Sequence, residues 1–448
     1  MSGWIEAEKR VERAQELYGQ GRLAEAAAEL QAAIDVNPSN AAWYFNLGLT
    51  LEAMEDYRRA CKAYQHALEL EPHDIETLTC LGVNQTRCGR FLEAIKSFER
   101  VERIDPAFEP SYCNRIVTYC EMGDHDKAEQ MFHLARLFKD QCPVCYHNIA
   151  GSYYARGEYD RAVDCWQQAL KLDARYPQAH ACIAEALWAQ GKLDDARAHY
   201  EAELRTAPQD ADTLADLGEL LVELGRHQEA EDCFRRVLAI QPDHAGARFG
   251  LGEAALKRNL LDQAEAEFQK VLLSEPDYPG LHLHLAHVLL RKGRRSKAVK
   301  HLLAELDACG DEPALLQEIG LLLIRARRTR RANAVLKRLV RLCPTDPQAM
   351  HNLAISYFML HRLEEGITCC RKALKLRPDY PLALYNLAIA HLQKGEVPRA
   401  RRYAVRALTA SPGNKQIVQL CRQLGAEGML SRLTGRLNRP RGFRKMPS

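Results

Sequence analysis

The sequence predicts an all-α protein, a right-handed superhelical solenoid of about twelve helical hairpins. Its 448 residues repeat with a period of thirty-four from Ala7 to Asn414, without one insertion or deletion. Small residues and proline recur at fixed positions of these blocks, and apolar residues recur within each block at helical spacing. A fixed period of this length is the signature of a fold in which every repeat packs on its neighbours.

The first helix of each block is predicted from apolar residues that lie three and four positions apart. In the second block, Tyr44, Leu47 and Leu51 fall on one helical face. The eighth position is Gly or Ala in every block except the fourth, which has Ile116. A small side chain at this position allows a second helix to approach closely.

A short polar break separates the first helix from a second one, and it carries Gly in eight blocks. Gly suits the end of a helix because it tolerates positive φ. The twentieth position, in the second helix, is Ala in every block except for Gly366. Pro at position thirty-two ends the second helix in nine blocks. Each block is therefore one hairpin that must stack on its neighbours to bury its apolar face.

These residues resemble the tetratricopeptide repeat, and the resemblance covers about nine-tenths of the chain. Two blocks match its pattern closely: Tyr44–Leu47–Gly48–Leu51 with Ala60–Tyr64–Ala67–Pro72, and Leu214–Leu217–Gly218–Leu221 with Ala230–Phe234–Val237–Pro242. The fourth and ninth blocks depart from it at Arg115 and Ile116, and at Glu305 and Gly310. The resemblance implies a superhelix whose first helices line a concave groove.

The same period sets the domain boundaries that we expect. A lead-in occupies residues 1–6, the twelve repeats occupy 7–414, a capping helix follows over 415–427, and a basic flexible tail covers 428–448. The content of Gly, Pro and Arg in this tail leaves little to pack.

The N-terminal residues, the apolar runs and the cysteines indicate the cellular compartment of the protein. The first six residues lack the basic and apolar pattern of a signal peptide, and no apolar run reaches eighteen residues. The fifteen cysteines show no disulfide-framework spacing, so we expect free thiols that act as small apolar residues in a reducing cytoplasm. The sequence thus predicts a cytoplasmic protein without a membrane span.

The net charge of +3 conceals a strong asymmetry along the chain. Residues 279–448 carry 32 Lys and Arg against 11 Asp and Glu, whereas the first 278 residues carry 30 against 48. Such asymmetry favours an electrostatic partner, although a solvated basic face explains it equally well. The basic third is poor in aromatic residues, and Phe443 is the only one in the tail. Nucleic acid needs stacking platforms, so we do not favour it as the partner. Binding of nucleic acid or of an acidic partner through the basic C-terminal third is kept as an alternative.

No sequence motif indicates an enzyme. The chain has no Gly-rich phosphate loop, no Gly-x-Ser-x-Gly elbow and no His-Glu-x-x-His. The repeats leave no room for a catalytic domain. We expect a non-catalytic protein without a cofactor.

One cysteine motif stands out, Cys142-Pro143-Val144-Cys145. A pair at a helix start can hold half a zinc site or have a lowered thiolate pKa, and Cys113 and Cys120 on the preceding helix could add ligands. No second such pair exists, so we predict no metal and keep a metal or redox role as an alternative.

Three histidines, His282, His284 and His287, form a second candidate metal site with Glu253 and Glu318 on the flanking repeats. Histidines that line a polar groove need no such role, and we do not favour a metal there.

The groove itself provides the predicted binding site. The resemblance places position six of each block on the concave surface, and five of these residues are Asn: Asn46, Asn114, Asn148, Asn352 and Asn386. An Asn side chain both donates and accepts, so it can pair with the backbone amide of an extended peptide. The arrangement resembles the asparagine ladder of the O-linked N-acetylglucosamine transferases, whose catalytic domain is absent here.

Acidic residues gather at the middle of this groove, and aromatic residues flank them. The acidic ones are Glu185, Asp212, Asp216, Glu219, Glu223 and Glu253, and the aromatic ones are Tyr154, Trp188, Phe358 and Tyr385. Carboxylates with neighbouring aromatic rings suit a basic, extended peptide. The sequence therefore predicts a non-catalytic scaffold or adaptor that binds extended segments of partner proteins.

Overall fold

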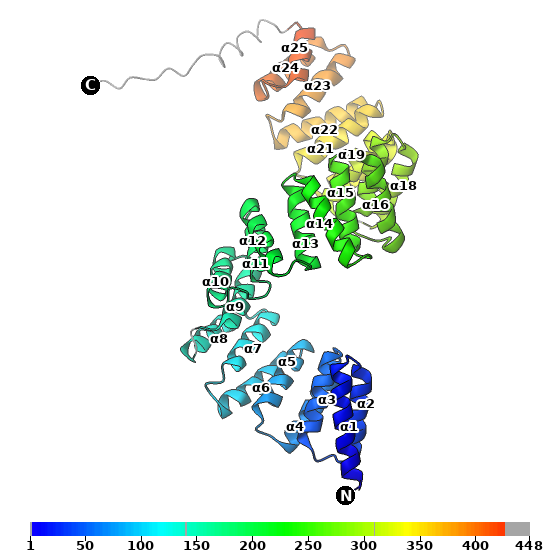
Figure 1. The fold of residues 1–448 in the computed structure, drawn as a ribbon. Coiled ribbons are helices and arrows are strands. Elements are labelled where there is room, and N and C mark those ends of the chain that lie inside the picture. The colour runs from blue at the N-terminus through cyan, green and yellow to red at the C-terminus, as the bar shows by residue number, and fades with distance from the viewer. Residues whose placement is uncertain (1, 139–140, 309, 426–448) are drawn as a thin grey trace, which may run out of the picture. The chain divides into compact units, whose positions relative to one another are not determined.

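A computed structural model describes residues 2–138, 141–308 and 310–425, and within these ranges it contains α-helices and no strand. The all-α hairpin architecture expected from the sequence is thereby confirmed. The chain forms two compact units, an N-terminal unit (Met1–Arg226) and a C-terminal unit (His227–Ser448). Figure 1 shows the helices of both units. The tail expected over 428–448 lies outside the described residues.

The N-terminal unit contains thirteen helices among its described residues. They are α1 (Ser2–Gly19), α2 (Leu23–Val36), α3 (Ala41–Ala53), α4 (Tyr57–Leu70), α5 (Ile75–Arg87), α6 (Phe91–Ile104), α7 (Glu109–Glu121), α8 (His125–Phe138), α9 (Pro143–Ala155), α10 (Tyr159–Leu172), α11 (Ala179–Ala189), α12 (Leu193–Thr206) and α13 (Ala211–Glu223).

The described part of the C-terminal unit contains the other twelve. They are α14 (His227–Ile240), α15 (Ala245–Lys257), α16 (Leu261–Ser274), α17 (Leu281–Arg291), α18 (Arg295–Ala308), α19 (Pro313–Arg325), α20 (Thr329–Leu342), α21 (Pro347–Met359), α22 (Leu363–Leu376), α23 (Pro381–Gln393), α24 (Val397–Ala410) and α25 (Lys415–Gln423). The last helix buries Ile417, Leu420 and Cys421 in a cluster with α24.

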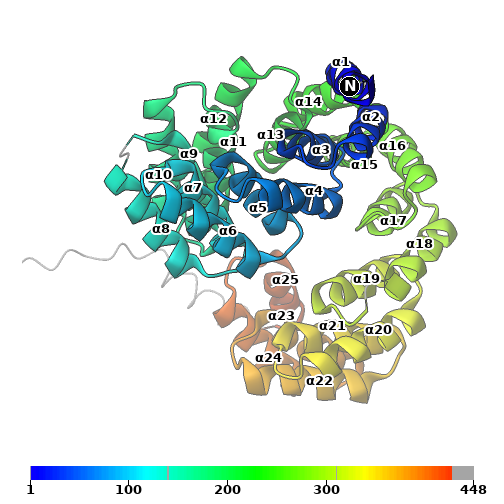
Figure 2. The same cartoon turned by 90° about the horizontal axis from the view of Figure 1, so that it is seen from below.

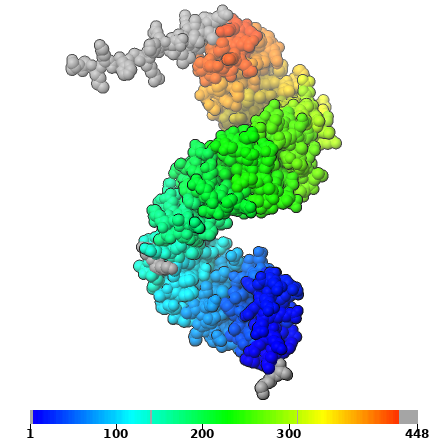
Figure 3. All heavy atoms as spheres, in the orientation of Figure 1, coloured from blue at the N-terminus to red at the C-terminus, as the bar shows by residue number. Residues whose placement is uncertain are grey.

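Within each unit the odd-numbered and even-numbered helices form two layers. Successive odd-numbered helices contact one another, as α5, α7 and α9 do in the N-terminal unit and α15, α17 and α19 in the C-terminal unit. Figure 2 shows α7, α9 and α11 of the N-terminal unit, and α15, α17, α19, α21 and α23 of the C-terminal unit, on the inner side of the even-numbered helices that follow them. In the space-filling view, the hairpins of the N-terminal unit pack in chain order, from blue to green (Figure 3). We call the surface formed by the odd-numbered helices of one unit its inner face.

The small residue at the eighth position sets the distance between the two helices of a hairpin. A Cβ atom added to Gly82 of α5 would lie 2.6 Å from the ring of Phe98 on α6, and one added to Gly252 of α15 would lie 2.5 Å from Phe268 on α16. Both rings are fully buried. The ring of the second helix therefore occupies the space that a side chain on the first helix would need.

The turn inside the hairpin has the same backbone conformation in all twelve blocks. Eight blocks use Gly with φ between 73° and 76°. The other four place Glu55, Asn259, Arg327 and His361 at the same position, with φ between 56° and 62°. The left-handed region is unfavourable for side chains other than Gly and Asn, so the packing of the hairpin imposes it on Glu55, Arg327 and His361.

The two blocks that depart from the repeat pattern are also packed. Ile116 is fully buried, and the buried side chain of Arg115 donates through Nη1 to Glu102 Oε2 at 2.7 Å. In the ninth block, Glu305 is buried at the position where most blocks have an apolar residue. These substitutions change the chemistry of the core locally, and the hairpins that contain them still form.

The sixth block shows how a buried carboxylate can replace an apolar residue. Glu203 of α12 is 5% exposed and accepts hydrogen bonds from the backbone N–H groups of Gln178 (3.0 Å) and His180 (3.2 Å). These groups lie at the start of α11. This helix has 11 residues and begins two residues later in its block than the first helices that have 13 residues. Glu203 thus satisfies backbone donors that the late start of α11 leaves free.

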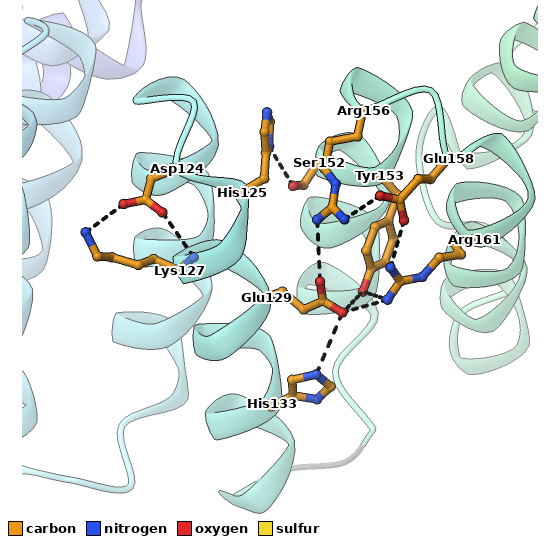
Figure 4. A network of polar contacts seen from close by, with 10 residues as sticks. All are labelled: Asp124, His125, Lys127, Glu129, His133, Ser152, Tyr153, Arg156, Glu158 and Arg161. Carbon is orange, nitrogen blue, oxygen red and sulfur yellow. Dashed lines mark hydrogen bonds and ion pairs between the residues drawn. The ribbon is translucent and has the colours of Figure 1, made fainter.

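A polar network joins the fourth hairpin to the fifth (Figure 4). Glu129 of α8 accepts from the hydroxyl of Tyr153 on α9 (3.0 Å) and from Nη2 of Arg161 on α10 (2.6 Å). The guanidinium of Arg161 also lies 3.9 Å from the centre of the Tyr153 ring. Burial opposes ionisation of Glu129, but the hydrogen bonds from Arg161 and Tyr153 outweigh it and hold its pKa below the usual value. The network fixes α8 against α9 and α10.

No helix in the described ranges is long and apolar enough to cross a membrane.

We predict that Gly82→Ala destabilises its hairpin by about 1–3 kcal/mol, because the added methyl group overlaps the buried ring of Phe98. Gly151→Ala in α9 is the matched control, since a Cβ there meets no atom within 4 Å. This control should stabilise its helix by roughly 0.5–1 kcal/mol.

Hydrogen exchange resolved by peptide is the appropriate measurement. Repeats couple mainly to their neighbours, so Gly82→Ala should lower protection chiefly in α5 and α6. Equal effects of the two substitutions would contradict the close approach of ring and glycine.

Candidate peptide-binding face

The predicted acidic residues of the N-terminal unit converge on its inner face. Asp212, Asp216, Glu219 and Glu223 are spaced four, three and four residues apart, so they share one side of α13. Glu185 lies on the neighbouring α11. Asp216 is half-buried, and the other four are exposed. We call these five residues the acidic cluster.

The electrostatics of the cluster show that its members are close in space. Burial, and then the neighbouring charges of Glu185 and Glu219, raise the pKa of Asp216 to about 6. The side chain of Glu185 is partly shielded from solvent, which also raises the pKa of its carboxyl group. A group of carboxylates that repel one another favours the arrival of a cation.

Aromatic residues connect this cluster to the preceding helices. The indole Nε1 of Trp188 on α11 donates to Glu223 Oε2 at 2.7 Å. Burial, and then the charge of Glu185, raise the pKa of Tyr154 on α9. Tyr200 of α12 is fully buried, and its pKa is raised by burial and by the charge of Asp216. Residues of α9, α11 and α13 thus lie around the acidic cluster.

The remaining acidic and aromatic residues of the predicted groove lie in the C-terminal unit. Glu253 is half-buried on α15. The ring of Phe358 on α21 fills the space above Gly366, where a Cβ would lie within 2.6 Å of its Cδ1. Tyr385 packs beside the apolar cluster of α24 and α25. Phe358 and Tyr385 thus contribute to packing, which the sequence pattern did not distinguish from exposure in a groove.

Two of the predicted asparagines lie in small hollows between successive inner helices. Asn46 of α3 lines a hollow with Gln15 and Tyr18 of α1. Asn114 of α7 lines another with Arg87 of α5. Both asparagines are half-buried.

The other three asparagines differ in their accessibility. Asn148 Nδ2 donates to the carbonyl of Cys113 at 3.4 Å, and Asn386 Nδ2 lies 3.3 Å from His351 Nδ1. Asn352 is only 4% exposed, and its Nδ2 has no hydrogen-bond partner. The five residues therefore do not form one uniform row of free amides, because neighbouring side chains cover Asn352 and engage Asn148 and Asn386.

Four residues that can bind a metal gather between α7 and α9. They are Glu109, Cys113, Cys142 and Cys145, and one ligand atom of each lies within 4.8 Å of all the others. The sequence indicated the three cysteines, but it missed Glu109. Cys120, the further ligand expected from the sequence, lies beside Ser152.

The expectation that every cysteine is free is wrong for one pair, because a disulfide joins Cys113 and Cys145. The idea that the start of α9 lowers the pKa of a thiol is also wrong for Cys142. Burial, and then the hydrogen bond with Glu109, raise the pKa of Cys142 to about 11.

The three histidines do not converge on one site. His282 Nδ1 lies 3.0 Å from His301 Nδ1, and His284 Nδ1 lies 2.9 Å from the carbonyl of Gly280. His287 Nε2 lies 2.7 Å from Glu318 Oε1. Each imidazole has a different partner, so the spacing in sequence does not produce a metal site.

Family models match several parts of the chain. The model described as the C-terminal domain of cilia and flagella-associated protein 70 matches residues 74–277. Models described as the TPR or tetratricopeptide repeat match residues 14–55, 41–74, 256–313 and 346–412.

The chain is similar to curated proteins and to solved structures, among them the following three. Peroxisome biogenesis protein 5 of Arabidopsis thaliana is 29% identical over 142 residues, which cover 31% of this chain and 18% of that protein. A UDP-N-acetylglucosamine–peptide N-acetylglucosaminyltransferase of Giardia intestinalis is 32% identical over 73 residues, 16% of this chain and 5% of the enzyme. The APC/C hetero-tetramer Cut9–Hcn1 superposes with a TM-score of 0.43 at 15% identity, covering 92% of this chain and 95% of that one. The matches thus span less than a fifth of either curated relative.

The raised pKa of Asp216 predicts a dependence of stability on pH. Because the folded chain holds this proton more tightly than the unfolded chain does, stability from this group falls as the pH rises from about 4 through about 6. Asp216→Asn should therefore stabilise the protein at pH 7 and have little effect near pH 4. We expect a difference of about 1 kcal/mol, after discounting the shift for the solvent that reaches the carboxyl.

Thermal denaturation between pH 4 and pH 8 measures this difference, with Asp194→Asn on the exposed side of α12 as the control. A stabilisation by Asp216→Asn that stays constant over the whole range would contradict a raised pKa.

Proposed function

Because this chain belongs to the tetratricopeptide-repeat superfamily, we propose that it is a non-catalytic, cytoplasmic protein-interaction scaffold. In this proposal an extended, basic segment of a partner protein binds along the inner face of the N-terminal unit. The observation that carries the proposal is the acidic cluster of α11 and α13, with its half-buried Asp216.

The repeated helices favour an extended ligand. Successive odd-numbered helices present equivalent positions at regular intervals, so a segment without secondary structure can contact several of them in turn. The hollows at Asn46 and Asn114 offer places for side chains of such a segment. Amides at these positions can pair with its backbone without reading its sequence.

The charges favour a basic ligand. The charges of Glu185 and Glu219 raise the pKa of Asp216, and a Lys or Arg side chain placed among these carboxylates would relieve this repulsion. Trp188 and Tyr154 border the cluster. Their rings can add cation–π contacts to a bound Lys or Arg.

The relatives support a scaffold function only through the repeats that they share with this chain. The match to the Giardia transferase spans 5% of that enzyme, so its activity is not transferred to this chain. The match to peroxisome biogenesis protein 5 covers 31% of this chain. Our proposal therefore depends on the geometry of the inner face.

A second binding surface is favoured by a hollow in the C-terminal unit. Val299 and Leu303 of α18 and the turn before α20 line this hollow. Five cations also line it, and none forms an ion pair among the described residues: Lys300, Arg327, Arg328, Arg330 and Arg331. Such a surface suits an acidic segment of a protein partner.

The main proposal predicts that Asp212→Lys combined with Asp216→Lys weakens the binding of a basic segment by well over tenfold. Like charges placed opposite each other in a specific interface cost several kcal/mol. The control is Asp194→Lys with Asp195→Lys, which makes the same change of charge on the outer helix α12. The probe is the tightest binder from a library of Lys- and Arg-rich peptides, and affinity is measured by calorimetry.

Circular dichroism should show unchanged helicity in both double variants, since all four residues are partly or fully exposed. Equal loss of affinity in the two variants would show a non-specific effect of charge. A wild-type chain that binds only acidic peptides, and loses them with Arg330→Glu and Arg331→Glu, would move the function to the C-terminal hollow.

A further inference from the structure

A compact group of three sulfur atoms and one carboxylate occupies the contact between α7 and α9. Glu109 and Cys113 lie one turn apart on α7. Cys142 is the residue before α9, and Cys145 lies in its first turn. The three cysteines are at most 4% exposed, whereas Glu109 is half-buried. The donor set is thus shielded by protein and open toward solvent only on the side of the carboxylate.

The separations within this group match the edges of a tetrahedron around a zinc ion. Ligands at about 2.3 Å for sulfur and about 2.0–2.2 Å for oxygen lie roughly 3.4–3.8 Å from one another. Cys113 Sγ lies 3.7 Å from Cys142 Sγ and 3.5 Å from Glu109 Oε1. Cys145 Sγ lies 3.9 Å from the same Glu109 oxygen. The Cys113–Cys145 separation is shorter, because a disulfide joins this pair, and all four ligand atoms lie within 4.8 Å of one another.

A disulfide alone does not account for the arrangement. It requires only Cys113 and Cys145, yet Cys142 and Glu109 also converge on these two sulfur atoms. The backbone N–H of Cys145 donates to Cys142 Sγ at 3.3 Å. Donors to sulfur orient and stabilise metal-bound thiolates. No other group of three or more metal-binding side chains gathers in this way in the described part of the chain.

We propose that in the reduced chain Cys113, Cys142, Cys145 and Glu109 bind one zinc ion, which ties α7 to α9. Three thiolates and one carboxylate provide four ligands, as structural zinc sites require. The proposal is independent of peptide binding, since none of these residues belongs to the acidic cluster.

Formation of the site from the disulfide form is a two-step reaction. A thiol reductant first transfers two electrons and two protons to the Cys113–Cys145 disulfide, which gives two thiols while the reductant becomes a disulfide. Zinc binding then releases three protons from the three thiols to solvent. A small-molecule disulfide reverses the first step by oxidising Cys113 and Cys145, and the ion leaves because two of its ligands are lost.

The two states therefore link the same helices in different ways. In one state zinc joins α7 and α9, and in the other the disulfide does. The contact between the fourth and fifth hairpins, which the network of Glu129 also stabilises (Figure 4), stays closed in both. Zinc release on oxidation should thus occur without loss of helicity.

The test uses the full chain, reduced with a phosphine under anaerobic conditions, loaded with Zn²⁺ and freed of excess metal. We expect about one zinc ion per chain by elemental mass spectrometry. Cys142→Ser should lose the ion, although it leaves the disulfide pair intact. Cys120→Ser, which removes a thiol on the same helix α7 outside the cluster, should retain it. Glu109→Gln should weaken zinc affinity by more than tenfold.

Cobalt provides a readout that does not depend on the variants. Co²⁺ added to the reduced wild-type chain should give the visible spectrum of a tetrahedral site with thiolate ligands, and oxidation with a small disulfide should abolish it. The proposal is overturned if the folded, reduced wild-type chain binds neither metal, or if Cys142→Ser retains the wild-type zinc content. In either case the cluster would be only a covalent cross-link between two hairpins.

Discussion

The close approach of two helices inside each hairpin is the constraint on which the rest of the structure depends. A residue without a large side chain on the first helix faces a buried ring on the second, as Gly82 faces Phe98 and Gly252 faces Phe268. This contact fixes the rotation of the first helix about its axis. Eleven of the twelve blocks have Gly or Ala at this position, so the first helices present the same side to the inner face. Residues far apart in sequence, such as Glu185 and Asp216, then meet on one face.

The same constraint explains why much of the fold could be predicted from the sequence. Period, small residues and proline define the hairpins without tertiary information. The sequence predicts the left-handed conformation of the turn residue only where that residue is Gly. At Glu55, Arg327 and His361 the residue type argues against that conformation, and the packing of the hairpin overrides it. The sequence also did not predict that Glu203 caps the start of α11, since this contact depends on the residue at which α11 begins.

The candidate sites were predictable to different degrees. The acidic cluster follows from the repeat register, because inner positions are equivalent in every block. Accessibility does not follow from register: Asn352 and Phe358 occupy inner positions, yet neighbouring side chains cover Asn352 and Phe358 packs over Gly366. The cysteine cluster depends on how α7 packs against α9, so the sequence suggested its cysteines but not Glu109. The only available signal was the one-turn spacing of Glu109 and Cys113.

The central claim is that an extended basic segment lies on the inner face of the N-terminal unit. Photo-crosslinking from single positions tests it most directly. A benzophenone amino acid would replace either Ala189, exposed at the end of α11 beside Trp188, or Ala198, exposed on the outer helix α12. Our account predicts that a bound Lys- and Arg-rich peptide crosslinks from position 189 and not from position 198. Crosslinks from position 198 alone would contradict it.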